Sequence, residues 1–402
     1  MLTKIYHRIR CHISLLIVMS FFMGCNQINE EPNIVVSDNQ EIDLTLYFPT
    51  RSVGNELETS ILDPLNDYFT KDESVLLISQ RTQNRSLSFK DEIDDGSKND
   101  YLFKYVWDGT EAETSESGNL PNWGNGYNFK SSSEWGNPLT WTTVMNHGDY
   151  GNTYAFGALY YPKDNSEKSS VETDQSSLDN LKKSNILGTY HQTENLYERF
   201  RFRLYHLMAC IRVTILVPYL KTDDVNGTTG FDKRNIVANL LNLKKDFTID
   251  WANLSSEERP VLKEDENITT TTNIKMYLQP VSGDRQNVVW NLSNFGMEGS
   301  DEVIEYTFTG LFPAQFISNS TNLLKFDIMQ KNSTRNIQTS YYWSSIQLST
   351  SLQISSGTIT NLVLYFPRGD NNAILLKSEI LDWNHADTNV TITPETDQQN
   401  KS

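Results

Sequence analysis

Cysteine and histidine are scarce in this sequence. Its 402 residues contain three cysteines and six histidines. Cys11 and Cys25 lie near the amino terminus, so Cys210 is the one thiol of the folded part, which must gain its stability from packed cores and not from disulfides. The histidines are scattered and lack the H-x-x-x-H or cysteine–histidine spacing of a zinc site. No metal and no cofactor are therefore predicted.

Positive charge is also in short supply. The chain has 34 Lys and Arg residues against 51 Asp and Glu residues, a formal net charge of −17. Removal of an amino-terminal signal would also remove Lys4, Arg8 and Arg10, which changes the formal net charge from −17 to −20. Because so acidic a chain repels phosphate backbones, nucleic acid is excluded as a partner.

Long apolar runs are missing except at residues 13–23, which follow a basic start. As a helix this run rises about 16 Å, too little for a hydrocarbon core of about 30 Å. Residues 1–24 therefore have the pattern of a secretory signal peptide, with Gly24 as the small residue before the cleavage point at Cys25. No other stretch is long and apolar enough to span a membrane.

The series Phe22-Met23-Gly24-Cys25 resembles a bacterial lipobox, although Phe22 and Met23 are bulkier than its usual residues. In a lipobox the cysteine is acylated, by palmitate among other chains, and two or more acyl chains anchor a protein stably. The prediction is a lipidated Cys25 followed by a polar tether over residues 25–40. The alternative is an ordinary signal peptide with an incidental cysteine.

The first strand is expected directly after this tether. Ile42, Leu44, Leu46 and Phe48 alternate with Asp43, Thr45 and Tyr47, which predicts a half-buried strand that ends at Pro49. Similar runs of five to nine residues recur along the chain without a helical period. The expected fold is all-β, built from antiparallel sandwiches.

Two domains are expected from the length of the chain and from a polar, glycine-containing segment near its middle. The polar run after Pro218 is the best linker, which divides the sequence into an N-terminal domain at 41–220, a linker at 221–230 and a C-terminal domain at 231–402. Within residues 200–217 the apolar face changes sides, which predicts a break near residues 207–209. The series DLTLYFPT at 43–50 resembles NLVLYFPR at 361–368.

Motifs for catalysis are missing as well. The sequence has no G-x-S-x-G elbow, and its acidic clusters lack the D-x-D-x-D-G alternation of a calcium loop. The expectation is a protein that is not an enzyme. A glycoside hydrolase stays open as an alternative, because its two carboxylates meet only in space. The aromatic residues Trp123, Tyr127, Trp135 and Trp141 could stack on sugars, but a core role is favoured.

Several stretches, taken together, resemble the fimbrillin family, the subunits of type V pili on Gram-negative anaerobes. They follow one another along most of the chain. They are the lipobox ending at Cys25, the strand before Thr50-Arg51, the pair at 139–141 and 154–162, the strand at 206–213 and the ending at 356–383.

This resemblance implies two tandem transthyretin-like β-sandwich domains and assembly by donor-strand exchange. In that process an arginine-specific protease removes the first strand, and an extended segment of a neighbouring subunit fills the gap. Carried onto this chain, cleavage falls between Arg51 and Ser52. The removable strand then contains Ile42, Leu44, Leu46 and Phe48. The candidate donor is residues 388–393, with Val390 and Ile392 as its apolar residues, unless this segment merely completes the last strand.

The resulting hypothesis is a structural or adhesive subunit of a cell-surface pilus (fimbrium), anchored in the outer membrane through the lipid on Cys25. Its partners would be other pilus subunits and a host or bacterial surface ligand. The alternative is a glycan-binding surface lipoprotein of a polysaccharide-uptake system.

Overall fold

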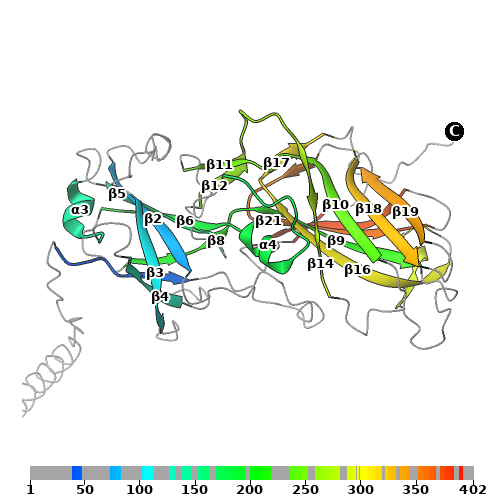
Figure 1. Cartoon of the computed structure of the whole chain (residues 1–402), viewed down its shortest axis with the longest axis horizontal. Coiled ribbons are helices and arrows are strands. Elements are labelled where there is room, and N and C mark those ends of the chain that lie inside the picture. Colours follow the sequence, from blue (N-terminus) through cyan, green and yellow to red (C-terminus); the bar gives the residue numbers. More distant parts are fainter. Residues whose placement is uncertain are drawn as a thin grey trace, which may run out of the picture. The chain divides into compact units, whose positions relative to one another are not determined.

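Figure 1 shows the computed structural model of the chain. The chain divides into two units at Gln40 and Glu41, and every strand named below belongs to the second unit. The structure describes residues 39–47, 73–82, 102–112, 126–132, 138–146, 153–162, 169–194, 200–218, 235–251, 259–280, 288–295, 297, 299–318, 322–331, 336–344, 352–367, 372–383 and 389–392.

Strands dominate these residues, which confirms the predicted all-β fold class. The helices among them are short, namely α3 (Trp141–Asn146), α4 (Leu178–Lys183) and the 3-10 helix η4 (Leu292–Phe295). Within the described ranges no helix has the length and apolar character needed to cross a membrane.

The first sheet has eight strands in the order β7-β1-β4-β3-β2-β5-β6-β8. Its members are β1 (Leu44–Tyr47), β2 (Ser74–Thr82), β3 (Leu102–Glu111), β4 (Gly126–Ser131), β5 (Thr153–Tyr160), β6 (Leu187–Thr193), β7 (Phe200–Arg203) and β8 (Tyr205–His206). The consecutive strands β7 and β8 pair with β1 and β6 respectively, so the chain joins the two ends of the sheet. Phe156 on β5 and Phe200 on β7 accordingly pack together, with ring centroids 4.3 Å apart.

The second architectural element is a sandwich of two sheets. A seven-stranded sheet contains β14 (Tyr277–Leu278), β16 (Ser300–Phe312), β9 (Ala209–Pro218), β21 (Thr358–Tyr365), β22 (Ile374–Asp382) and β23 (Asn389–Ile392) in that order, with β15 (Val288–Asn291) also paired to β16. A four-stranded sheet contains β13 (Thr272–Lys275), β10 (Asn235–Leu243), β18 (Asn322–Lys331) and β19 (Asn336–Ser344). Two ribbons, β11 (Phe247–Asp250) with β12 (Val261–Glu264) and β17 (Gln315–Ile317) with β20 (Leu352–Ile354), complete the strands.

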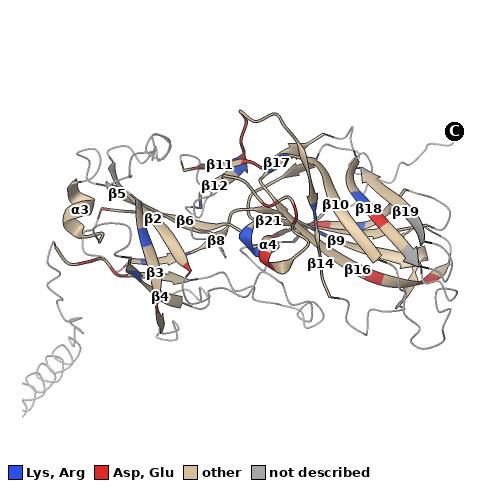
Figure 2. Cartoon of the chain, in the orientation of Figure 1, with Lys and Arg blue, Asp and Glu red and all other residues tan. Residues whose placement is uncertain are grey.

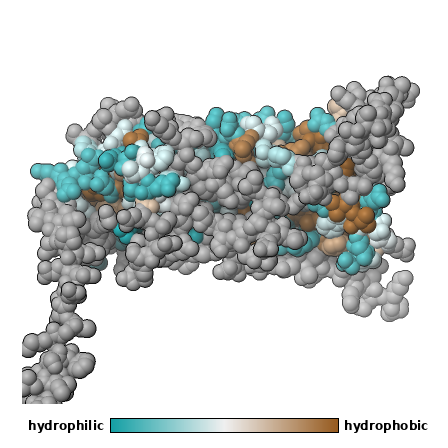
Figure 3. Space-filling model, turned by 90° about the horizontal axis from the view of Figure 1, so that it is seen from below, coloured by the Kyte–Doolittle hydropathy of each residue, from teal (hydrophilic) through white to brown (hydrophobic). Residues whose placement is uncertain are grey.

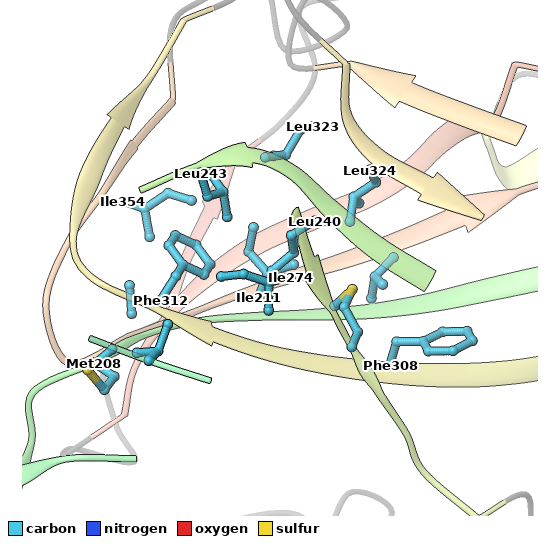
Figure 4. Close-up of a cluster of buried hydrophobic side chains, with 14 of the residues drawn as sticks. Met208, Ile211, Leu240, Leu243, Ile274, Phe308, Phe312, Leu323, Leu324 and Ile354 are labelled. Carbon is cyan, nitrogen blue, oxygen red and sulfur yellow. The ribbon is translucent and has the colours of Figure 1, made fainter. Parts of the chain in front are cut away.

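The core of this sandwich lies between its two sheets (Figure 4). Ile211 and Phe308 reach it from the seven-stranded sheet, and Leu240 and Leu324 reach it from the four-stranded sheet. Alternate residues of β9 supply the core because side chains of a strand point to opposite faces in turn. The packing is close, since a Cβ atom on Gly310 would lie 2.7 Å from Leu240 Cδ1.

The strand β9 does not lie where the sequence-based division places it. The predicted N-terminal domain, 41–220, includes residues 209–218, but β9 pairs with β16 and β21 of the seven-stranded sheet. The predicted break before it is confirmed, because β8 ends at His206 and β9 begins at Ala209. Alternation within a strand shows which face is buried but not which strands lie beside it, so the sequence did not indicate that β9 pairs with β16 and β21. Residues 221–230, the expected linker, lie outside the described residues.

The segment before β6 is held against the end of β16 by a buried amide. Gln175 is fully buried, and its side chain accepts a hydrogen bond from Leu311 N and donates one to Leu311 O, both at 2.8 Å. Its own backbone N–H donates to the Lys275 carbonyl oxygen. Ser177 then caps α4 by accepting from Asn180 N. The amide thus satisfies backbone groups of β16 as a neighbouring strand would.

The described surface mixes charges of both signs with scattered apolar residues (Figures 2 and 3). Charges on the strands form pairs, such as Lys325 with Asp327 on β18 at 3.0 Å and Lys377 with Glu379 on β22 at 3.2 Å. The most exposed large apolar side chains among the described residues are Val289 and Phe316, on β15 and β17. Single apolar residues of this kind are normal on a protein surface.

Candidate functional site

The candidate site is the position of β1 between two other strands, which we call the β1 slot. β1 runs antiparallel to β4, with Leu44 opposite Phe129, and parallel to β7, with Leu44 opposite Phe200. Both edges of β1 are therefore paired, and its removal would leave unpaired backbone groups on β4 and on β7.

The apolar side chains of this strand fill the interior of the first sheet. Leu44 and Leu46 are buried, as is Ile42 just before the strand. Burial on the predicted face is thereby confirmed for these three residues. Phe48, the fourth member of that face, lies outside the described residues. Burial of each of the two leucine side chains stabilises β1 in the sheet by on the order of 2 kcal/mol.

Tyr47 departs from the expected alternation. The sequence pattern places it on the polar face with Asp43 and Thr45, but the residue is only 3% exposed. Its ring lies over Gly126 of β4, where a Cβ atom would come within 2.7 Å of Tyr47 Cε1. Because β4 offers no side chain at this point, the tyrosine is buried on the outer face of its strand.

Thr45 occupies the outer face of β1 and meets Asn128 of β4. Thr45 Oγ1 donates a hydrogen bond of 2.9 Å to Asn128 Oδ1. The amide nitrogen of Asn128 donates in turn to Thr110 Oγ1 at 3.1 Å, and that hydroxyl donates to Asp108 Oδ1 at 2.5 Å. Sequence patterns gave no sign of this network, because it joins residues 83 positions apart.

The ends of β1 are fixed by hydrogen bonds outside the ladder. Ile42 N donates to Leu139 O at 2.9 Å, and Leu204 N donates to Tyr47 O at 2.8 Å. The Tyr105 hydroxyl donates to the Ile42 carbonyl oxygen at 2.9 Å. Burial, reinforced by the charges of Glu41 and Asp43, raises the pKa of Tyr105 far above its usual value. The phenol therefore stays protonated and remains a donor throughout the neutral range.

The sequence echo between 43–50 and 361–368 corresponds to an equivalent place in the two sheet systems. β21 is parallel to β9 on one side and antiparallel to β22 on the other, as β1 is to β7 and β4. Leu362 and Leu364 are buried like Leu44 and Leu46, and Tyr365 is buried like Tyr47. The position of Thr45 is taken by Val363. The same local pattern therefore fills a comparable slot twice.

The candidate donor is also a strand in this structure. Val390 and Ile392 belong to β23, which pairs antiparallel with β22 through Val390 opposite Ile380 and Ile392 opposite Ser378. β23 lies at the end of the seven-stranded sheet. The residues predicted for lipidation and processing, Gly24, Cys25, Arg51 and Ser52, lie outside the described residues.

Two residues considered for chemistry have structural roles. His206 is buried, its Nδ1 lies 3.0 Å from Asn185 Oδ1, and its ring stacks on Trp383 at 3.9 Å. Burial, with a smaller contribution from the Arg259 charge, lowers the pKa of His206 to about 3. Cys210 is buried within β9, as expected from its apolar neighbours. Neither side chain is open to a substrate.

The aromatic residues considered for sugar stacking lie in different surroundings. Trp141 is buried in α3 and packs on Phe200 with ring centroids 5.3 Å apart, which confirms its core role. Tyr127 is half-buried and lies edge-on to Trp107 at 5.8 Å. Trp123 and Trp135 fall outside the described residues. Among the described residues no group of three or more His, Cys, Asp or Glu is placed to hold a metal ion.

The fold and the slot define a class: an all-β chain whose first strand completes a sheet between two strands that come later in the sequence. No family model and no curated protein matches the sequence. Solved structures similar to it include a candidate cell adhesion protein of Bacteroides ovatus, at 11% identity and a TM-score of 0.45, covering 86% of this chain and 99% of that one. A candidate cell adhesion protein of Bacteroides uniformis is similar at 11% identity and a TM-score of 0.44, covering 85% and 99%.

A third similar structure is a fimbrial assembly protein of Parabacteroides distasonis, at 9% identity and a TM-score of 0.35, covering 85% of this chain and 96% of that one. With identities near one tenth and TM-scores below 0.5, these similarities do not support a functional assignment. The function is therefore inferred from the residues of this chain.

Proposed function

We propose that this protein is a structural or adhesive subunit of a cell-surface pilus, exported as a lipoprotein and joined to other subunits by donor-strand exchange. It is not an enzyme. The lipid on Cys25 holds the newly exported subunit on the outer membrane, and cleavage between Arg51 and Ser52 releases it for assembly.

The observation that carries this proposal is the place of β1 in both the sheet and the chain. β1 is paired on both sides within the sheet, yet it is the first strand of the part of the chain that the structure describes. A cut after it leaves the rest of the chain continuous, whereas excision of any strand from β2 to β22 would divide the chain in two. A strand that is internal to the sheet can thus be released by one cleavage.

An emptied β1 slot has the features that bind an extended peptide. β4 and β7 would present unpaired N–H and C=O groups, and the interior would have two apolar pockets where Leu44 and Leu46 lie. A strand of another subunit with apolar residues at alternate positions satisfies both sets of groups. Exposed edges of this kind otherwise aggregate, so cleavage and filling have to be coupled.

One cleavage would detach both the anchor and the strand. Cys25, the tether and β1 all precede Arg51 in the sequence. A cut between Arg51 and Ser52 therefore frees the subunit from the membrane at the moment when its slot opens. Before that cut the subunit is complete and does not polymerise, which keeps assembly on the cell surface.

The test is to treat the purified chain, without its signal peptide, with an arginine-specific protease. Trimming after Arg51 followed by a ladder of oligomers on gels supports the proposal. The matched control is Arg51→Lys, which keeps the charge but removes the cleavage site, and it should stay monomeric. An uncleaved wild-type monomer that binds polysaccharide would overturn the pilus subunit in favour of the glycan-binding lipoprotein.

A further inference from the structure

The connection between β5 and β6 is much longer than the pairing of these two strands requires. Tyr160 at the end of β5 lies opposite Leu187 at the start of β6, so the strands form an antiparallel hairpin. Such a hairpin closes with a turn of about two to five residues. The chain instead runs through residues 161–186 before it returns to the first sheet. Long connections inside a compact structure commonly have a role of their own.

The described part of this connection that lies on the sandwich is residues 169–186, which we call the arm. Its first attachment is at the start of β11. Val171 N donates a hydrogen bond to Lys245 O at 3.0 Å, and Phe247 N donates one to Ser169 O at 2.8 Å. Val171 and Phe247 are both buried in the apolar cluster that contains the sandwich core. The arm thus pairs with this part of the chain as a short antiparallel strand would.

A second attachment lies at the end of β13 and reaches β16. Lys275 N donates to Thr173 O at 2.8 Å, and Gln175 N donates to Lys275 O at 2.9 Å. The Lys275 ammonium also lies 3.9 Å from Asp174 Oδ2, although so exposed an ion pair adds little stability. The buried side chain of Gln175 forms its two hydrogen bonds with Leu311 on β16. The arm therefore satisfies backbone groups in both sheets of the sandwich.

The helix α4 gives the arm an apolar anchor. Leu181 of α4 is fully buried in a cluster with Cys210 of β9 and Ile359 of β21. These two residues belong to the outer face of the seven-stranded sheet, and α4 lies over that face (Figure 1). Ser184 ties the two ends of the arm together, because its Oγ accepts a hydrogen bond from Glu172 N at 3.1 Å.

The chain also passes directly from the first sheet to the sandwich between β8 and β9. Leu207 O accepts a hydrogen bond from Ser356 Oγ at 2.5 Å, and Met208 O accepts one from Gly357 N at 2.9 Å. A joint made of one short segment lets the units on either side turn about it, and such motion is the ordinary expectation for adjoining units. The arm adds attachments at other strands, namely β11, β13 and β16.

We propose that the arm locks the first sheet to the sandwich, so that the two move and unfold as one body. This inference goes beyond the proposed function and does not depend on strand exchange. Attachments at several strands remove the rotation that a single joint permits. The packing agrees, since one apolar cluster contains Ile78 of β2, Val171 of the arm and Phe308 of β16. A pull on one sheet system would thus pass to the other without bending between them.

The lock is tested by removing the arm while keeping the hairpin. In this variant residues 161–186 are replaced by an Asn-Gly turn, which closes a short hairpin between Tyr160 and Leu187. The matched control is Asp174→Asn, which removes the exposed ion pair with Lys275 and leaves the backbone hydrogen bonds of the arm in place.

The readout is the distance between two dyes, measured by single-molecule fluorescence energy transfer. The chain begins at Asn26, so the buried Cys210 is its one natural thiol and takes no dye. Lys130→Cys on β4 and Val289→Cys on β15 replace exposed residues of the first sheet and of the sandwich. Wild type and Asp174→Asn should give one narrow distribution, and the variant without the arm should give one at least about twofold broader.

Two results of this measurement would overturn the lock. One is a broad distribution in the wild-type chain, and the other is an equal width with and without the arm. Failure of the trimmed wild-type chain to form a ladder of oligomers is a separate outcome, which contradicts the proposed function and leaves the lock intact.

Heat unfolding of the wild-type chain decides the matter if the variant without the arm does not fold. One body should unfold in one transition, with calorimetric and van 't Hoff enthalpies that agree to within about 10%. Two separate transitions would show that the first sheet and the sandwich unfold independently, and they would overturn the lock. Where the variant without the arm does fold, it should show two transitions.

Discussion

Thr45 Oγ1 and Asn128 Oδ1 lie 2.9 Å apart, and this hydrogen bond joins β1 to β4, the strand beside it in the sheet. The bond is partly buried, so its net contribution is expected to be near that of an ordinary side-chain hydrogen bond. Thr45→Val should lower the free energy of unfolding of the untrimmed chain by about 1 kcal/mol, measured by urea denaturation. Thr45→Ser keeps the donor and serves as the control, and a loss as large as that of the valine variant would contradict the role of the hydroxyl.

Gly126 is expected to tolerate no side chain while Tyr47 is in place. A Cβ atom there would lie 2.7 Å from Tyr47 Cε1 and 2.9 Å from Ala112 Cβ. Gly126→Ala should therefore destabilise the untrimmed chain by about 1 to 3 kcal/mol, through a shift of β1 away from β4. Calorimetric melting of the single variants and of Gly126→Ala with Tyr47→Ala measures the coupling. Strictly additive effects would show that the tyrosine ring is not the obstacle.

The buried amide of Gln175 should be costly to replace. Gln175→Leu preserves much of the volume but leaves the N–H and C=O groups of Leu311 without their partner. A loss of about 2 to 4 kcal/mol in the free energy of unfolding is expected, from two buried backbone groups left unsatisfied. Ser176→Ala, one residue away on the exposed side, should change it by no more than about 0.5 kcal/mol. Equal effects for the two variants would contradict the bridging role.

The stability of the protein should fall in mild acid because of His206. The imidazole has a pKa near 6.5 in the unfolded chain and about 3 in the folded one, since burial and the Arg259 charge disfavour its protonated form. The stabilising difference is therefore complete above pH 6.5 and is lost as the pH falls toward 3. At pH 5 the loss from this residue is about 2 kcal/mol.

The pH effect is assigned by comparing two histidine variants in urea denaturation at pH 7 and pH 5. His206→Gln should show a smaller drop between these pH values than wild type, although it is less stable at pH 7 through the loss of the stack on Trp383. His191→Gln, at a partly exposed histidine, should keep the drop of the wild type. An unchanged drop in His206→Gln would mean that other groups cause the acid sensitivity.

The strand β1 could be predicted from the sequence, but its surroundings could not. Alternation identified Leu44 and Leu46 as core residues because burial of one face imposes a period of two. Tyr47 was misplaced because its burial depends on Gly126, which lies 79 positions later and offers room only once β4 is aligned. The pairing of Thr45 with Asn128 was missed for the same reason, since register between distant strands is a property of the folded sheet.

The sequence echo could be seen in the sequence, whereas the pairing of β9 could not. The match between residues 43–50 and 361–368 was visible in the sequence, and its described strand residues, 44–47 and 362–365, occupy equivalent positions in two sheets. The membership of β9 was not visible, because an apolar strand between Met208 and Pro218 could join either sheet. Local pattern thus predicts the strand and its buried face, whereas neighbours are decided by long-range packing.

Assembly by this route requires that β1 is removed and that a strand of another subunit fills its slot. The most direct measurement is the amino-terminal mass of the subunit in polymers taken from the cell surface. The expected subunits begin at Ser52 and lack both the lipid and β1. Polymers built from subunits that begin at a lipidated Cys25 would retain β1 in its slot and would contradict the exchange of this strand.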